Sequence, residues 1–235
     1  MPANGKGAQD LDALTREIIE CRACPRLVDW REEVARQPRA AFRNERYWAR
    51  PVPGFGDPAA RVLVVGLAPA AHGGNRTGRV FTGDRSGDWL FAAMYRAGYA
   101  NQPTSVSAAD GLALHGAYVA AAVRCAPPAN RPTIDERDRC LPYLERELKL
   151  LSDVQVIVVL GSFAYDALAR VVSLPRPRPK FGHGVEVPAG DLTVVCCYHP
   201  SQQNTFTGKL TVPMLDAVFA RARELTTRAA RRPRR

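Results

Sequence analysis

The amino-acid sequence predicts an α/β fold of three layers, an α/β/α sandwich built on a four-stranded parallel sheet. Four short runs are apolar along their whole length and predict strands at residues 63–66, 118–123, 154–161 and 192–198. Each run is followed by a segment with helical periodicity, and buried strands that alternate with helices are typical of a parallel sheet. Parallel strands end along one edge, so the loops that follow the four runs are expected to form one site.

The N-terminal part of the chain predicts helices and a loop. Residues 1–10 predict a flexible leader, and an amphipathic helix follows from Leu11 with its apolar residues on one stripe. A second helix is predicted over residues 26–37. Residues 42–60 are rich in proline and glycine and predict a loop with one short strand near residues 47–48.

The first predicted strand leads into a long polar loop with four glycines, two arginines, a histidine and an aspartate before the next helix. Ser86 is predicted to cap that helix, which carries apolar residues at helical spacing. A glycine-rich loop between a strand and a helix is where α/β proteins bind ligands and phosphates.

The second half of the chain repeats the alternation. The proline-rich loop after the second strand ends at Thr133, which is predicted to cap a helix over residues 134–151. Further helices are predicted over residues 163–172 and 211–225. Residues 226–235 form a basic tail that we expect to be disordered.

Length and composition are those of a globular protein with one large domain or two small ones, and the charge favours an anionic partner. The chain of 235 residues is 46% hydrophobic and has neither a long apolar run nor a secretory leader, so a cytoplasmic location is expected. Its formal net charge is +10, and only four of its 33 basic residues are lysines. Such a surplus favours nucleic acid as a partner, although an arginine-rich genome or the tail alone also accounts for it.

Six cysteines divide into two groups. Cys196 and Cys197 lie inside a predicted strand and are expected in the core. The other four follow a spaced pattern; they are Cys21, Cys24, Cys125 and Cys140. Four thiolates that converge suit tetrahedral zinc or an iron–sulfur cluster, while unrelated thiols or a redox-active CxxC remain alternatives.

Three motifs carry a resemblance to a known family. They are GLAPAAHGGNRTGRVFTGDRSG at 66–87, AAVRCAPPANRPT at 121–133 and YHPSQQNTFTGKLT at 198–211. In this order they resemble the uracil-DNA glycosylase superfamily, and specifically its family-5 (UDGb-type) branch. The resemblance covers residues 11–225 and implies that they form a single α/β/α domain. It also implies a DNA substrate and a 4Fe–4S cluster held by the four spaced cysteines. A monomer is expected.

The resemblance implies roles for five residues. A flipped base would stack on Phe81, and neutral His199 would donate a hydrogen bond to the base O2. Asp84 would orient the attacking water, although it also suits a helix cap. Asn130 is a second water-positioning candidate or a turn residue, and His72 is a candidate lining residue or simply solvated.

Departures from the family pattern bear on specificity. The first motif begins at Gly66, and Ala68 stands where family-1 enzymes are acidic. Ala121 stands where family-4 enzymes place an asparagine that pairs with uracil. We therefore expect removal of uracil and of other deaminated bases such as hypoxanthine and xanthine. The motif cores lack a lysine for a Schiff base, which favours hydrolysis to an abasic site in base excision repair.

The basic and polar residues of the motifs predict the DNA contacts. They are Arg76, Arg79, Arg85, Arg131, Gln203, Asn204 and Lys209. The segment around Phe206 resembles a minor-groove wedge. Two alternatives from other classes are a non-catalytic iron–sulfur redox protein on nucleic acid and a zinc-stabilised nucleic-acid-binding module.

Overall fold

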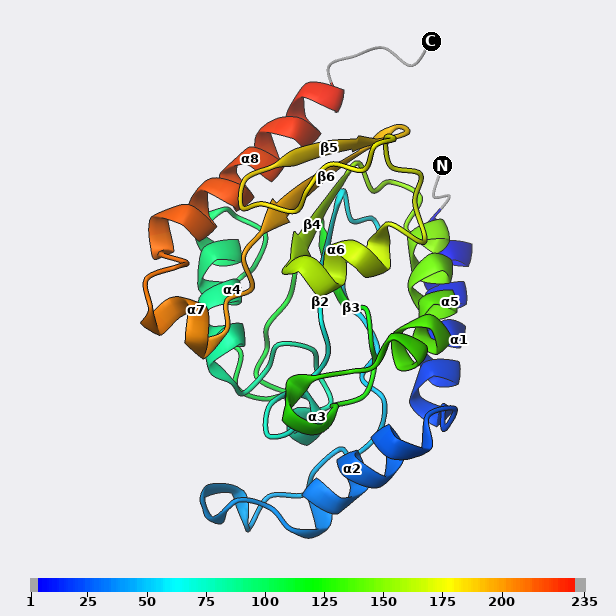
Figure 1. Ribbon diagram of the computed structural model, residues 1–235, viewed down its shortest axis with the longest axis vertical. Helices are drawn as coiled ribbons and strands as arrows, with labels where there is room; N and C mark the ends of the chain where they lie inside the picture. Colours follow the sequence, from blue (N-terminus) through cyan, green and yellow to red (C-terminus); the bar gives the residue numbers. More distant parts are fainter. Residues whose placement is uncertain (1–3, 231–235) are drawn as a thin grey trace.

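Six strands form one mixed sheet in the computed structural model, which describes residues 4–230 (Figure 1). In sheet order they are β1 (Phe55–Gly56), β3 (Ala117–Ala121), β2 (Val62–Gly66), β4 (Val156–Leu160), β6 (Leu192–Cys197) and β5 (Glu186–Ala189). The four central strands are parallel, as predicted. The antiparallel edge strands β1 and β5 were not predicted. The short strand predicted near residues 47–48 is wrong, because the chain pairs with β3 at Phe55 and Gly56 instead.

The helices of the described chain connect and cover these strands. They are α1 (Asn4–Glu20), α2 (Pro25–Arg36), α3 (Gly74–Thr77), α4 (Arg85–Arg96), α5 (Ile134–Leu150), α6 (Ser162–Leu168), α7 (Gln202–Phe206) and α8 (Val212–Ala230), with 3₁₀ turns at Ala40–Phe42 and Pro128–Asn130. Because α1 begins at Asn4, most of the predicted leader is helical. Helix α8 likewise continues into the predicted tail as far as Ala230. The remaining parts of both predicted segments lie outside the described residues.

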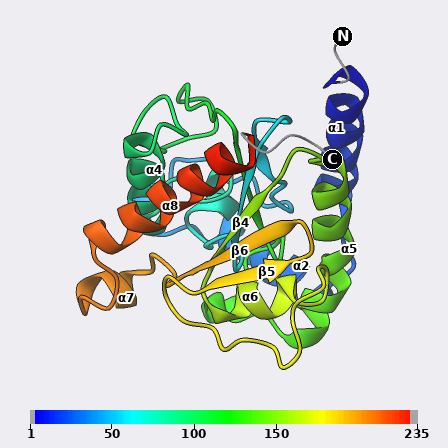
Figure 2. The same cartoon turned by 90° about the horizontal axis from the view of Figure 1, so that it is seen from above.

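Two apolar clusters, one on each face of the sheet, make three layers. On one face, Val64 and Val158 pack with residues of α4 and α8 such as Phe91 and Phe219. On the other face, the alternate side chains of the same strands pack against α1, α5 and α6. Figure 2 shows these two helical layers on opposite sides of the strands. The central strands are buried along almost their whole length because both of their faces are covered.

The adjacent cysteines of β6 follow the alternation of a strand. Cys196 packs in the cluster with α5 and α6, whereas Cys197 packs in the cluster with α4 and α8. Both are fully buried, as predicted. Among residues 4–230, no helix is both long and apolar enough to span a bilayer.

The parallel strands place four loops at one edge of the sheet. Gly66 at the end of β2 is in register with Ala121 at the end of β3. The two chains stay paired beyond the sheet, since Ala122 N–H donates to the Gly66 carbonyl and Val123 N–H donates to that of Leu67. Helices α3 and α7, which belong to the loops after β2 and β6, lie in the lower half of Figure 1. The motif loops therefore share one side of the molecule, as predicted.

Candidate active site

Phe81 lies at the carboxyl end of β2 and forms the floor of the site. Its side chain is 6% exposed and its φ is +51°. A Cβ atom on Gly66 would stand 2.5 Å from Phe81 Cζ, and one on Gly87 would stand 1.9 Å from the Phe81 carbonyl oxygen. Phe81 therefore reaches this position only because glycines occupy the end of β2 and the first turn of α4.

His199 follows β6 and faces Phe81. The two ring centroids are 5.8 Å apart, with the planes tilted by 33°. Burial lowers the pKa of His199 to about 4, so the imidazole is neutral near pH 7. The side-chain amide of Asn204 donates to the His199 carbonyl oxygen at 2.9 Å and fixes the loop. A neutral imidazole held beside an aromatic ring is suited to donate a hydrogen bond to a bound planar base.

Asp84, rather than Ser86, caps helix α4. Its Oδ1 accepts a hydrogen bond from Gly87 N–H at 3.0 Å, and this correction to the predicted cap follows from the extended backbone of Asp84. A Cβ atom on Gly73 would stand 2.1 Å from Asp84 Oδ2, so a glycine on the opposite side of the loop admits the carboxylate. Burial raises the pKa of Asp84. The cap places this carboxyl at the helix turn that also packs on the Phe81 carbonyl.

Three other predicted site residues lie in different places relative to Phe81, His199 and Asp84; they are Asn130, Ala121 and Ala68. Asn130 ends the turn after Pro128 with a φ of +55° and is exposed, and within the described chain no hydrogen bond joins it to Asp84 or His199. Ala121 is buried at the end of β3, opposite Gly66. Ala68 packs against the buried cysteines.

His72, predicted to line the base pocket, contacts the segment before β1 instead. Its Nδ1 lies 2.8 Å from the hydroxyl of Tyr47, and its ring stacks on Phe42 at a centroid distance of 6.3 Å. Burial lowers the pKa of His72. The position of this residue indicates that it anchors the loop to residues 42–47.

Two of the predicted DNA-contacting arginines are internal structural residues, which corrects the prediction. Arg79 is 5% exposed and its Nη2 donates to both carboxylate oxygens of Asp110, at 2.8 and 2.7 Å. Arg76 donates to the carbonyl oxygens of His72 and Gly83 and pairs with Glu45. Neither guanidinium is available to a phosphate, because each is already paired with a carboxylate and other acceptors inside the protein.

Among the other predicted DNA contacts, one side chain is bonded inside the protein and four are exposed. Asn204 is committed to the His199 loop. The exposed residues are Arg85, Arg131, Gln203 and Lys209. Arg85 lies over the ring of Phe206 at 4.4 Å, and this ring is 67% exposed. An exposed aromatic ring under a guanidinium is suited to contact with bases and phosphates.

The four spaced cysteines converge between α2, α5 and the loop after β3. Cys24, Cys125 and Cys140 form a buried cluster with Leu27 and Val123. Cys21 is less buried and lies close enough to raise the pKa values of the other three thiols, a smaller effect than their burial. Within residues 4–230, no group of three or more His, Cys, Asp or Glu side chains is arranged to hold a metal ion.

The sequence patterns did not single out two buried polar residues that join the cysteines to the first motif. Arg31 Nη1 donates to Cys125 Sγ at 2.9 Å, and its guanidinium contacts the Cys21 carbonyl. The side chain of Asn75, which is completely buried, donates to the Arg31 carbonyl at 3.1 Å. The only sequence signal for Asn75 is its position in the glycine-rich motif, between Gly74 and Arg76.

Comparisons with known proteins show which proteins the chain is similar to. The family model described as the uracil DNA glycosylase superfamily matches residues 53–223. A Mycobacterium tuberculosis protein named type-5 uracil-DNA glycosylase is 55% identical over 223 residues, which cover 93% of this chain and 83% of the relative. Type-5 enzymes of Thermus thermophilus and Pyrobaculum aerophilum are 50% and 45% identical, covering 92% and 90% of this chain and 98% and 91% of theirs.

Proposed function

The chain belongs to the uracil DNA glycosylase superfamily, and from this premise we propose that it is a hydrolase that removes uracil from DNA. The observation that carries the proposal is the grouping of Phe81, His199 and Asp84 at the edge of the sheet where β2 and β6 end. The product is an abasic site, the starting point of base excision repair. The enzyme is monofunctional, since the motif cores offer no amine for a Schiff base.

Each of the three side chains has a task in this hydrolysis. A base inside a duplex is out of reach, so the enzyme takes it out of the stack and holds it on the ring of Phe81. Cleavage of the N-glycosidic bond leaves negative charge on the base, and His199, neutral because it is buried, donates a hydrogen bond to the base O2. Asp84 caps α4 through one oxygen and uses the other to orient water toward the sugar.

The substrate range extends beyond uracil to hypoxanthine and xanthine. Discrimination between bases depends on polar groups that remain unpaired when the wrong base is bound. Ala121, at the end of β3 opposite Gly66, has no polar side-chain atom, so it does not penalise a different base edge. We expect the rates of base release from duplexes with uracil, hypoxanthine or xanthine to differ by no more than about tenfold. Strict selection of uracil would contradict this part of the proposal.

We also propose that Cys21, Cys24, Cys125 and Cys140 hold a 4Fe–4S cluster. The four thiols are not arranged around one centre in the described chain. The proposal is supported by Arg31, which contacts Cys125 and whose buried Nε has no hydrogen bond there. A buried donor of this kind finds acceptors in the sulfur atoms of a cluster. When bound, the cluster supplies iron–thiolate bonds that cross-link the segment between α1 and α2 to α5 and to the loop after β3.

Asp84→Asn separates the proposed catalysis from the cap. Asparagine caps a helix about as well as aspartate, so the melting temperature is expected to stay close to that of the wild type. The rate of uracil release in single turnover is expected to fall by about 10²–10⁴-fold, because a neutral amide cannot replace the carboxylate that orients the attacking water. Asp88→Asn removes an exposed carboxylate from the same helix and is the matched control, with an unchanged rate.

Anaerobic purification tests the cluster and the enzyme together. We expect a brown protein with about four iron atoms per chain and abasic sites in a uracil-containing duplex. A brown protein that leaves the duplex intact would refute the glycosylase and favour a redox protein. A colourless protein with bound zinc would refute the cluster while leaving the activity to be judged by its own assay. A wild-type rate for Asp84→Asn would limit Asp84 to its structural role.

A further inference from the structure

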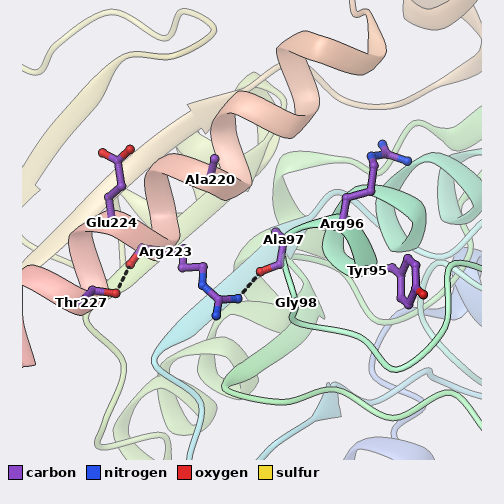
Figure 3. Close-up of a pocket in the computed structure, with 8 residues that line it drawn as sticks. All are labelled: Tyr95, Arg96, Ala97, Gly98, Ala220, Arg223, Glu224 and Thr227. Atoms are coloured by element: carbon purple, nitrogen blue, oxygen red, sulfur yellow. Dashed lines mark hydrogen bonds between the residues drawn. The ribbon is translucent and has the colours of Figure 1, made fainter.

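Two hollows of similar size share no residue with the candidate active site. One, of about 650 Å³, lies between α4 and α8 and is drawn in Figure 3. Its arginines are engaged, because Arg223 donates to the Ala97 carbonyl oxygen and Arg96 pairs with Asp216. The other, of about 670 Å³, lies between α5, α6 and the segment that follows α6. In this second hollow the positively charged side chains outnumber the negatively charged ones.

Four arginines line this second hollow, which we call the arginine pocket. They are Arg137, Arg170, Arg176 and Arg178. The carboxylates near them are Asp166, which pairs with Arg178 at 2.8 Å, and Asp138, which contacts Arg137 and Arg170 at 2.7 and 3.7 Å. Four cations against two carboxylates leave the pocket with a formal charge of +2. An anionic ligand would balance that charge.

Arg137 gives the pocket a cation in its wall. The residue is 5% exposed and therefore holds its guanidinium away from bulk water. Its Nε donates to Asp138 Oδ1 at 2.8 Å, and its Nη2 lies 2.7 Å from the same oxygen as an ion pair but makes no well-aligned hydrogen bond within the described chain. A buried donor on a charged group is costly unless it has an acceptor. A ligand oxygen in the pocket would provide one.

Arg176 adds a cation without a carboxylate partner among residues 4–230. It lies in the segment between α6 and β5, next to Arg178 in the lining of the pocket. Guanidinium groups match phosphate oxygens in geometry and bind them through paired hydrogen bonds. We propose that the arginine pocket binds phosphate groups, supplied either by a DNA backbone or by a free phosphate-bearing compound.

The test uses the full-length protein and inorganic pyrophosphate as the probe. Arg170→Gln/Arg176→Gln removes two pocket arginines and leaves buried Arg137 in place. The control, Arg146→Gln/Arg221→Gln, removes two arginines that pair with Glu17 and Glu186 elsewhere on the surface. Calorimetric titration is expected to show pyrophosphate binding about tenfold weaker or more in the pocket variant and unchanged in the control.

An undamaged duplex identifies the source of the phosphate. If the DNA backbone occupies the pocket, the slope of log affinity against log salt falls in magnitude by about 2 in the pocket variant, because two phosphate contacts are lost. If pyrophosphate binding weakens but the slope stays the same, a free phosphate compound is the ligand. Neither measurement uses catalysis, so its outcome is independent of the proposed glycosylase function.

Two results would overturn the proposal. One is the absence of pyrophosphate binding by the wild type, and the other is equal binding by the wild type and the pocket variant. Circular dichroism and melting curves establish that the variants are folded. Arg176→Glu alone repeats the test at a position that has no ion pair to lose, and it is expected to weaken pyrophosphate binding more than Arg146→Glu does.

Discussion

Gly73 lies against the carboxylate of Asp84, and alanine at this position tests whether that carboxylate has to stay in place. A Cβ atom at residue 73 would stand 2.1 Å from Asp84 Oδ2. Ordinary contact begins at 3.4 Å, so the oxygen has to retreat by about 1.3 Å. The φ of Gly73 is −102°, outside the left-handed region, so this contact, rather than a positive φ, opposes the side chain.

The displacement is expected to have two measurable effects. Breaking the hydrogen bond from Gly87 N–H to Asp84 Oδ1 removes a helix cap and lowers the free energy of unfolding by about 1 kcal/mol. Moving the proposed water-orienting carboxylate by this distance slows uracil release by about 10²-fold. Urea unfolding measures the first effect, and single-turnover assays on a uracil-containing duplex measure the second.

Gly7→Ala is the control for Gly73→Ala. Gly7 lies in α1, and a Cβ atom there meets its nearest neighbour, the Leu150 carbonyl oxygen, at 3.9 Å. This variant is expected to keep the wild-type rate. A wild-type rate in Gly73→Ala with reduced stability would show that Asp84 serves only as a cap. Wild-type rate and stability together would refute the close approach itself.

Three further changes test other parts of the site. His199 has a pKa of about 4 when folded and about 6.5 when unfolded, so stability falls as the pH drops from 6.5 toward 4; urea unfolding of His199→Gln at pH 7 and pH 5 is expected to lack this loss. Burial opposes ionisation of Asp110, yet hydrogen bonds from Arg79 and backbone N–H groups lower its pKa to about 2. Arg79→Ala is therefore expected to cost about 3–5 kcal/mol in urea unfolding at pH 7 and less near pH 2, without changing the salt dependence of DNA binding. Phe206→Ala is expected to weaken duplex binding by about tenfold with little change in melting temperature, since the ring is 67% exposed.

Each of these expectations has a contradicting result. The same pH dependence in His199→Gln would mean that His199 is not the group that takes up the proton on unfolding. A reduced salt slope in Arg79→Ala would place that guanidinium on the DNA after all. Equal duplex binding by Phe206→Ala and by Val106→Ala, which changes a 63%-exposed side chain outside the predicted DNA contacts, would remove the ring from the DNA interface.

The central sheet was predictable because burial on both faces leaves a continuous apolar run in the sequence. The edge strands lack that signal. Strand β1 has only two residues, and β5 alternates exposed and buried positions around Pro188. Their pairing depends on the neighbouring strand rather than on their own residues, which is why the sequence pattern alone does not predict them.

The sequence predicted which residue types lie at the site better than it predicted the contacts that these residues make. The motif DRSG offers two capping side chains, and the extended backbone at Asp84 decides between them. Arg79 carries the same charge as an exposed arginine, and only folding brings Asp110, 31 residues away, to its guanidinium. Sequence patterns indicate which groups gather at the edge of the sheet. They do not indicate which of those groups satisfy one another.

The two antiparallel edge strands also have a consequence for association between molecules. An open edge of backbone N–H and carbonyl groups invites another chain to add a strand, and short edges, prolines and charges prevent this. Strand β1 ends after two residues, while in β5 Pro188 has no N–H to donate and Glu186 pairs with Arg221 at 2.6 Å. Both edges of the sheet are thereby protected against the addition of a strand from another molecule.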